Sequence, residues 1–336
     1  MKKKILYIGN QLAPLGKNAT TIDTLTPLFG DLGFEIVAVS SFENKFLKML
    51  HMLWSVVKCR NYDYLLIDTY STSNFYYALF CSQLARVFGL KYIPILHGGN
   101  LEKRLIDNPK LSRLIFNNAS VNVTPSLFLR EIFERNGYVN LIHIPNSIEL
   151  EKYIYKYRNE FKPKLMWVRA LADVYNPMMA LKVLKALQIK FPDASLTMVG
   201  PDKENLLNSL EEYCKVNNLN VKFTGKVSKE KIIDLAQEHD IFINTSRLDN
   251  LPVSILEAMA LHLPIVSTNV GGIGYLLENE KDSFLVGDND DVSMVERLVF
   301  SIENPIVVNK MLENASLKIK QFNWKIVSNK WLELLK

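Results

Sequence analysis

The sequence lacks the patterns that mark several common protein classes. Its three cysteines, Cys59, Cys81 and Cys214, lie far apart and form no CxxC or Cys/His cluster, so neither a disulfide framework nor a metal site is predicted. Isolated thiols of this kind are typical of a reducing cytosol. No run of about 18 apolar residues is present, so no transmembrane helix is predicted. The basic start, Lys2–Lys4, precedes only four apolar residues before Gly9, which predicts a first strand and not a signal peptide.

The first half of the chain is short of acidic residues. Residues 1–160 carry a net charge of +6 and the remainder carries −1. This excess suits an anionic surface or acceptor that the N-terminal half binds. No recognised nucleic-acid motif accompanies the charge, so we expect no nucleic-acid partner. A nucleic-acid binder that uses the basic half stays open as an alternative, which salt-sensitive binding would reveal.

Apolar runs of strand length alternate with amphipathic segments of helix length along the chain. This alternation predicts an α/β fold with parallel sheets covered by helices on both faces. The strand series restarts after a charge-rich segment, so two doubly wound domains are expected, with the ligand in the cleft between them. The predicted parts are a first domain 1–150, a linker 151–163, a second domain 164–322 and a C-terminal helix 323–336. The predicted strands are 4–8, 36–39, 64–67, 92–96, 121–124, 141–144, 164–168, 195–199, 221–224, 241–244 and 265–267.

A dinucleotide-binding turn is missing. A nicotinamide-dependent dehydrogenase would carry a G-x-G-x-x-G turn after a strand. Only Gly9 and Gly16 follow the first predicted strand, and their spacing does not fit that turn. The sequence therefore argues against a dehydrogenase.

Two carboxylates follow the predicted strand 241–244. Pro252 has the fixed φ that opens a helix, which places Asp249 in the loop and Glu257 about one turn into the helix. Carboxylates accept charge-assisted hydrogen bonds from hydroxyl pairs, and helix N-termini bind phosphate, so this pattern suits a sugar nucleotide. On spacing alone, a surface helix with Asp249 as a local cap and a solvated Glu257 is the favoured alternative.

The segment 249–273 resembles the retaining glycosyltransferases of family 4. Their pattern is an acidic residue, seven residues, then Glu-Ala-Met-Ala, a proline turn and a Gly-Gly loop, which here reads Asp249, Glu257–Ala260, Pro264 and Gly271-Gly272. The resemblance implies the GT-B architecture, with two Rossmann-like domains, an interdomain cleft, and a C-terminal helix 323–336 that packs back towards the first domain. It implies transfer of a sugar from a nucleoside-diphosphate sugar to a glycan, lipid-linked or surface-polysaccharide acceptor, with retention of configuration. The nucleoside-diphosphate sugar is the co-substrate, and neither a cofactor nor a metal is expected.

The resemblance also assigns roles at the second domain. Glu257 inherits the contact with the ribose hydroxyls, and Asp249 lies beside the transferred sugar. The backbone amides of Asn250 and Leu251 are expected to reach that sugar or the phosphates. Arg169, at the end of the strand 164–168, matches the arginine that neutralises the diphosphate; its alternative role is an interdomain salt bridge.

One departure from the family concerns the second cation. The lysine that usually accompanies the arginine is missing, and Asn176 stands in its place as a neutral donor to phosphate. The backbone at Gly225 and Lys226 is similar to the segment that frames the nucleotide base.

Three features of the first domain complete the resemblance. Gly16 lies in the loop that approaches the diphosphate and the acceptor in the family. His97, after the strand 92–96, matches a histidine that contacts the donor sugar. Lys103 and Arg104 are placed to meet an anionic acceptor or the phosphates.

Residues 45–60 predict a basic amphipathic helix. At about 100° per residue, Lys45, Lys48, His51, Ser55 and Lys58 share one face, and the apolar side chains take the other face. Such a helix can lie on an anionic membrane, or it can simply cover its sheet with the basic side in water. We therefore expect a cytoplasmic protein, with peripheral contact to the inner face of the membrane as a hypothesis.

Two further functions stay open. Another GT-B enzyme, such as a sugar-nucleotide epimerase or hydrolase, would share the donor site. The family more often has Glu, which is one methylene longer, where this chain has Asp249. This difference and the missing lysine are also compatible with a catalytically weak protein that binds nucleotides or glycans.

Overall fold

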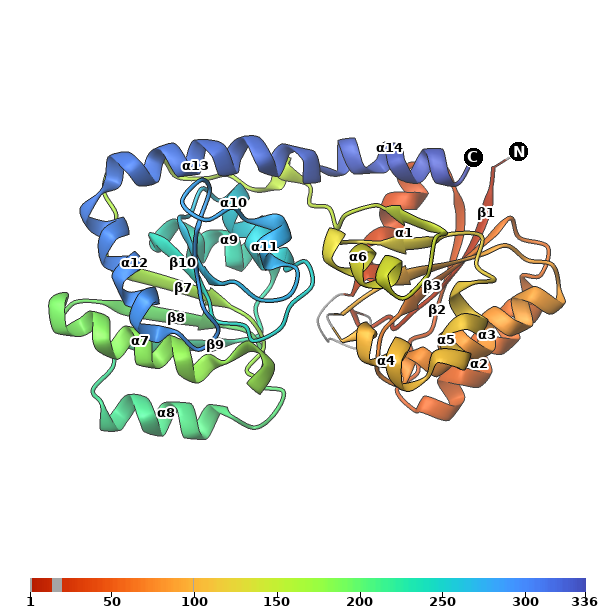
Figure 1. The fold of residues 1–336 in the computed structure, drawn as a ribbon, viewed down its shortest axis with the longest axis horizontal. Coiled ribbons are helices and arrows are strands. Elements are labelled where there is room, and N and C mark those ends of the chain that lie inside the picture. The colour runs from red at the N-terminus through yellow and green to blue at the C-terminus, as the bar shows by residue number, and fades with distance from the viewer. Residues whose placement is uncertain (1, 14–19, 99) are drawn as a thin grey trace. The chain divides into compact units, whose positions relative to one another are not determined.

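The computed structural model describes residues 2–13, 20–98 and 100–336 (Figure 1). The chain divides into two compact units, residues 1–145 with 334–336 and residues 146–333. Within the described residues, each unit contains one six-stranded sheet in which all pairings are parallel. The predicted α/β fold of two doubly wound domains is therefore confirmed.

The sheet of the first unit has the strand order β2-β1-β3-β4-β5-β6. Alternate residues of β1 face opposite sides: Leu6 and Ile8 join the core under α2, α3, α5 and α6, whereas Tyr7 packs on Phe29 of α1. Helices thus cover both faces, which suits strands as apolar as β3 and β4. The elements are β1 (Lys4–Ile8), α1 (Thr21–Asp31), β2 (Glu35–Val39), α2 (Lys45–Lys58), β3 (Tyr64–Thr69), α3 (Asn74–Val87), β4 (Tyr92–Leu96), α4 (Leu101–Asp107), α5 (Pro109–Phe116), β5 (Asn122–Thr124), α6 (Leu127–Arg135) and β6 (Leu141–His143).

The helix α2 is turned differently from the prediction. Lys48 and Ser55, which were expected in water, are buried, while Phe46, Leu50 and Trp54 are exposed. The predicted assignment is therefore wrong for Lys48 and Ser55 of the basic side and for Phe46 and Leu50 of the apolar side. Trp54 was expected at the border between the two sides.

Hydrogen bonds explain how α2 buries polar groups. The Lys48 ammonium donates to the Asn10 side-chain oxygen (3.0 Å), and the Ser55 hydroxyl donates to the backbone oxygen of His51 (2.8 Å). Buried polar groups with such partners avoid the cost of an unmade hydrogen bond. Met52 and Val56 can then face the sheet, and none of the described helices has the length and apolar character to span a bilayer.

The sheet of the second unit has the strand order β12-β11-β10-β7-β8-β9. One face packs on α7, α8 and α12 through Leu165 and Trp167, and the other packs on α9 and α10 through Met166 and Phe242. The elements are η2 (Leu150–Lys152), β7 (Lys164–Val168), η3 (Asp173–Tyr175), α7 (Pro177–Lys190), β8 (Ser195–Val199), α8 (Leu207–Val216), β9 (Val221–Gly225), α9 (Lys229–Glu238), β10 (Ile241–Asn244), α10 (Val253–Ala260), β11 (Ile265–Thr268), α11 (Ile273–Leu276), β12 (Phe284–Val286), α12 (Asp291–Glu303), α13 (Pro305–Ile319), η4 (Lys320–Phe322) and α14 (Trp324–Leu334).

The segment predicted as a linker, 151–163, falls within the second unit. Its Arg158 is buried there, donates to Asp240 (3.0 Å) and also donates to backbone oxygens of Ala236 and His239. At the other end of the chain, residues 334–336 belong to the first unit, where the Tyr64 hydroxyl donates to the backbone oxygen of Lys336 (3.0 Å).

Candidate functional site

The loop between β10 and α10 is held in place by its backbone neighbours. The backbone N–H of Gly272 donates to the carbonyl oxygen of Asp249 (2.8 Å). A Cβ atom on Gly271 would overlap that same oxygen, and one on Gly272 would overlap the carbonyl oxygen of Asn250. Gly271 also has a φ of +55°, which favours glycine. The Gly-Gly pair is therefore required for two loops to touch at the carboxyl ends of β10 and β11.

This loop presents Asp249 to Arg169, which follows β7. One Arg169 Nη atom lies 2.7 Å from a carboxylate oxygen of Asp249, and both side chains are mostly buried. The guanidinium also lies over the ring of Tyr175 at 5.3 Å. Burial raises the pKa of Tyr175, so this ring stays neutral beside the ion pair. The structure thus brings together two residues that the sequence predicted separately, and Arg169 pairs within its own unit.

Glu257 lies in the second turn of α10 and is almost fully buried. Burial raises the pKa of its carboxyl group, and the positive charge of Lys229 and the hydrogen bond from Tyr153 act in the opposite direction. The Tyr153 hydroxyl donates to Glu257 at 3.0 Å, and the Lys229 ammonium lies 3.8 Å away. The alternative of a solvated Glu257 on a surface helix is wrong.

A small cavity lies beside Glu257. Met166, Phe242 and Leu263 form part of its apolar wall, and Ser254 adds a hydroxyl group. That hydroxyl oxygen is buried and has no hydrogen-bond partner among the described residues. Buried oxygens of this kind are rare in folded proteins and are satisfied by ligands or water.

Asn176 has a local structural role. Its backbone is left-handed (φ 49°), its side-chain oxygen accepts from the N–H of Met179, and its amide donates to Asn289 (3.3 Å). The side chain therefore caps α7. A contact between Asn176 and a donor phosphate stays a prediction.

For the remaining predicted residues of the second unit, the prediction concerned the backbone and not the side chain. The N–H of Asn250 donates to the Asp249 side chain (2.8 Å), and the carbonyl oxygen of Leu251 accepts from Asn146 (3.3 Å). Gly225 ends β9 with a φ of +66°, and Lys226 follows it on the surface.

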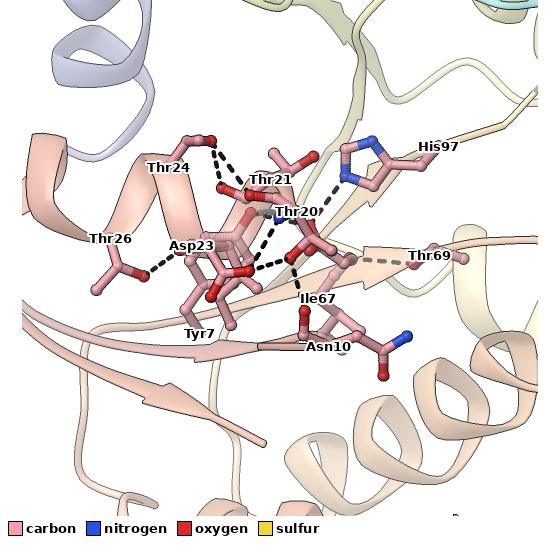
Figure 2. Close-up of polar contacts among 12 residues, drawn as sticks. Tyr7, Asn10, Thr20, Thr21, Asp23, Thr24, Thr26, Ile67, Thr69 and His97 are labelled. Atoms are coloured by element: carbon pink, nitrogen blue, oxygen red, sulfur yellow. Dashed lines mark hydrogen bonds and ion pairs between the residues drawn. The ribbon is translucent and has the colours of Figure 1, made fainter. Parts of the chain in front are cut away.

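In the first unit, His97 forms part of a buried polar cluster (Figure 2). Its Nε2 lies 2.9 Å from one carboxylate oxygen of Asp68, and the Tyr7 hydroxyl donates to the same oxygen (2.8 Å). An ionised carboxylate can only accept, so Nε2 donates to it, and in the neutral form of the imidazole Nδ1 is then an acceptor. The imidazole stacks on Tyr70, with 4.8 Å between ring centres. Burial raises the pKa values of both tyrosines, which keeps them as neutral donors.

The loop that contains Gly16 begins and ends in an ordered network. The Asp23 carboxylate accepts from the N–H groups of Leu12 (3.1 Å) and Thr20 (2.9 Å), and the Thr20 hydroxyl donates to the carbonyl oxygen of Asn10 (2.6 Å) (Figure 2). Gly16 itself lies outside the described residues.

Lys103 and Arg104 lie on α4 and have protein partners. Lys103 pairs with Asp107 (3.0 Å) on the surface. Arg104 donates to the carbonyl oxygen of Ser71 (2.6 Å) and to Asn108 (2.9 Å). Their predicted contacts with an acceptor or phosphates stay predictions.

The carboxylates and histidines of the described residues do not gather as metal ligands. No group of three or more His, Cys, Asp or Glu side chains among them could hold a metal ion.

Known proteins share this sequence pattern and this fold. Residues 152–318 match the family described as glycosyl transferases group 1. HepE of Anabaena, solved in complex with UDP-glucose, superimposes with a TM-score of 0.77 at 16% identity, over 99% of both chains. The second unit therefore matches this glycosyltransferase family, and the chain as a whole has the GT-B fold.

Two bacterial relatives resemble this glycosyltransferase along most of its length. UDP-Gal:alpha-D-GlcNAc-diphosphoundecaprenol alpha-1,3-galactosyltransferase of Escherichia coli is 25% identical over 82% of this chain and 75% of its own length. N,N'-diacetylbacillosaminyl-diphospho-undecaprenol alpha-1,3-N-acetylgalactosaminyltransferase of Campylobacter jejuni is 25% identical over 93% of this chain and 88% of its own length.

Four residues of the site were missed in the sequence. Tyr153 and Lys229 approach Glu257 from segments far away in sequence, and no local pattern marks them. Asp68 carried a usable signal, because β3 and β4 are neighbouring parallel strands that end at Thr69 and Leu96, just before His97. Tyr7, on β1, pairs with Leu66 of β3 and could have been found in the same way.

Proposed function

We propose that this glycosyltransferase belongs to the retaining enzymes of family 4 and transfers a sugar from a nucleoside-diphosphate sugar to a glycan or lipid-linked acceptor. The observation that carries the proposal is the Arg169–Asp249 pair at the strand ends, followed by the buried Glu257 one turn into the next helix. A guanidinium can neutralise a diphosphate, and a carboxylate can orient sugar hydroxyls. The names of the relatives, which include a UDP-sugar donor and undecaprenol-diphosphate acceptors, support the same substrate classes.

Glu257 is the proposed ribose contact. Its carboxylate is buried with one tyrosine donor, so it retains lone pairs for two neighbouring hydroxyl groups. Hydrogen bonds to a charged group contribute about 1.5–3 kcal/mol each, more than neutral ones.

Arg169 is the proposed partner of the leaving diphosphate. When the bond between the sugar and the phosphate breaks, negative charge grows on the diphosphate, and a positioned cation lowers the energy of that transition state. With Asn176 in the place of the usual lysine, Arg169 and helix N-termini carry this role. Transfer without a metal is part of the proposal, because Asp249 lies in no group of three or more possible metal ligands among the described residues.

Retention follows from attack on the face that the diphosphate leaves. The acceptor oxygen forms the new bond to the anomeric carbon as the bond to the phosphate oxygen breaks, and the acceptor proton passes to that phosphate oxygen. Asp249 orients a hydroxyl of the transferred sugar in this scheme. His97, with Nδ1 free to accept, would bind another sugar hydroxyl.

A donor screen tests the proposal. Nucleoside-diphosphate sugars, screened one by one at millimolar concentration, should include one that raises the melting temperature of the wild-type chain and has no effect on Glu257→Gln. A panel without any stabilising donor would contradict the assignment. With the right donor, turnover should be equal in excess EDTA and in Mg²⁺ if no metal takes part.

An acceptor of this class supports an activity at a membrane surface, and the cytoplasmic face stays a prediction from the sequence. Undecaprenol-linked substrates, which the names of both relatives contain, are lipids. Turnover on a diphosphoundecaprenol-linked sugar, and not on the free sugar, would support this location.

A further inference from the structure

Two adjacent helices of the first unit expose large apolar side chains. α2 and α3 pack side by side (Figure 1), and the Tyr77 hydroxyl of α3 donates to the carbonyl oxygen of Lys45 (3.4 Å). On α2, Phe46 (69% exposed) and Trp54 (65%) lie eight residues apart on one line of the helix surface. We call the whole set the α2–α3 apolar surface: Phe46, Leu47, Leu50, Trp54, Tyr76 and Phe80.

This arrangement is unfavourable in water alone. The chain buries Lys48 and leaves Trp54 in solvent, and apolar area left in water is unfavourable. Single apolar side chains on a surface are ordinary, but six large ones on two helices that pack against each other indicate a surface for a partner. The orientation of α2 therefore points to a partner for its outer side.

The charges on these helices indicate which partner fits. α2 and α3 together contain no Asp or Glu. Lys45, Lys58 and Arg86 are exposed on them, and Arg60 follows α2. The nearest acid in sequence is Glu43, before α2. A group of apolar side chains surrounded by cations fits an anionic membrane, because the cations can contact the headgroups while the apolar side chains contact the acyl chains.

A second copy of the chain suits this surface less well. A two-fold contact places the same patch of both copies face to face, so Lys45 and Lys58 would meet the same cations of the other copy, and Glu43 is the acid nearest to them in sequence. A bilayer offers both the apolar layer and the negative charge.

We propose that the α2–α3 apolar surface docks on bilayers that contain anionic lipids. Trp54 and Tyr76 sit at the depth of the headgroups, where aromatic side chains are favoured. Phe46, Leu50 and Phe80 reach the upper acyl chains, and the flanking lysines contact the headgroups. The sequence suggested that a basic amphipathic helix 45–60 could lie on an anionic membrane; here the contact is made by the exposed apolar side chains of α2 and α3 and by the flanking cations, and it does not depend on the donor site.

Vesicle co-sedimentation tests the proposal. The wild-type chain should sediment with phosphatidylcholine vesicles that contain phosphatidylglycerol, and much less with phosphatidylcholine alone. Phe46→Ser with Trp54→Ser should weaken this binding at least about tenfold, because two large apolar side chains no longer enter the bilayer. The charge variant Lys45→Glu with Lys58→Glu should remove the preference for anionic vesicles. Ile189→Ser with Ile306→Ser, two apolar residues of the second unit that are even more exposed than Phe46 and Trp54, is the control and should bind as wild type.

Several outcomes would overturn the proposal. They are a wild-type chain that binds neither kind of vesicle, a Phe46→Ser/Trp54→Ser variant that binds as well as wild type, and a wild-type dimer that this variant dissociates, which would assign the surface to a second copy. An unchanged melting temperature of the double variant shows that lost binding is not lost folding, as expected for side chains already in water.

Discussion

At the scale of single residues, Glu257 shows how burial and function oppose each other. Burial raises the pKa of this carboxyl group, whereas ribose binding needs the ionised form. A raised pKa in the folded state means that ionisation costs stability as the pH rises through it. Burial of the ionised Glu257 carboxylate therefore lowers the free energy of unfolding, and the same charge strengthens the proposed contact with the donor.

Glu257→Gln should separate these two effects. We expect donor affinity at neutral pH to fall about 10–100-fold, which corresponds to hydrogen bonds to a charged acceptor. The free energy of unfolding at neutral pH should stay equal or rise, since the desolvated charge is gone. Calorimetric titration and thermal unfolding measure the two quantities, and a variant that binds donor as wild type would refute the ribose contact.

The same carboxyl group predicts a pH dependence. Donor binding should be complete well above the raised pKa of Glu257 and should be lost as the pH falls through it, in a window above the ordinary value of 4.5. Titrations over this range should show the loss in the wild type, and Glu257→Gln should be flat. An acid loss that is identical in both chains would assign the titration to another group.

Asp68 is the residue that positions His97. Asp68→Asn removes the charge that fixes the His97 Nε2–H, so we expect kcat to fall about 10–100-fold with little change in KM for the donor. Tyr7→Phe, which removes the other bond to the same oxygen, should have a smaller effect, because the imidazole keeps its carboxylate partner. If Asp68→Asn and Tyr7→Phe lower kcat equally, Asp68 has no special role.

At the scale of elements, the Gly271-Gly272 turn has no room for a larger residue. Gly272→Ala places a methyl group on the carbonyl oxygen of Asn250, so the loop with Asp249 must move. We expect a loss of several kcal/mol of stability, or misplacement of Asp249 with loss of activity. Gly30→Ala in α1, where a methyl group meets open space, is the control and should stabilise by about 0.5–1 kcal/mol. An active, stable Gly272→Ala chain would contradict the account of this turn.

The order of the elements could be predicted from the sequence, but the side that each helix buries could not. β7, β8 and β10 follow the predicted ranges because buried parallel strands are continuous apolar runs. The rotation of α2 depends on Asn10, which lies 38 residues from the Lys48 that it binds. The packed side of α14 depends on the fold in the same way, because Val327 is buried while its neighbour Ile326 is half exposed.

The candidate site could be predicted where a local motif exists and not elsewhere. Asp249, Glu257 and Arg169 were found because they lie in one motif or at a strand end. Tyr153 and Lys229 are far from Glu257 in the sequence and approach it only in the folded structure, so no sequence pattern predicts their contacts.

At the scale of the whole molecule, the proposed chemistry divides between the two units. Arg169, Asp249 and Glu257 belong to the second unit and His97 to the first. His97→Ala should therefore keep the thermal stabilisation by the nucleoside diphosphate and lose most sugar transfer. If the nucleoside diphosphate no longer stabilises this variant, the division of roles is wrong.

The central claim, sugar transfer with retention, is tested most directly by product analysis. The wild-type chain is incubated with the donor from the screen and a diphosphoundecaprenol-linked acceptor, and the products are analysed by mass spectrometry and proton NMR. The account predicts one nucleoside diphosphate released per sugar transferred, acceptor-dependent release, and the donor's anomeric configuration in the product. An inverted anomer, or donor hydrolysis that is independent of acceptor, would contradict it.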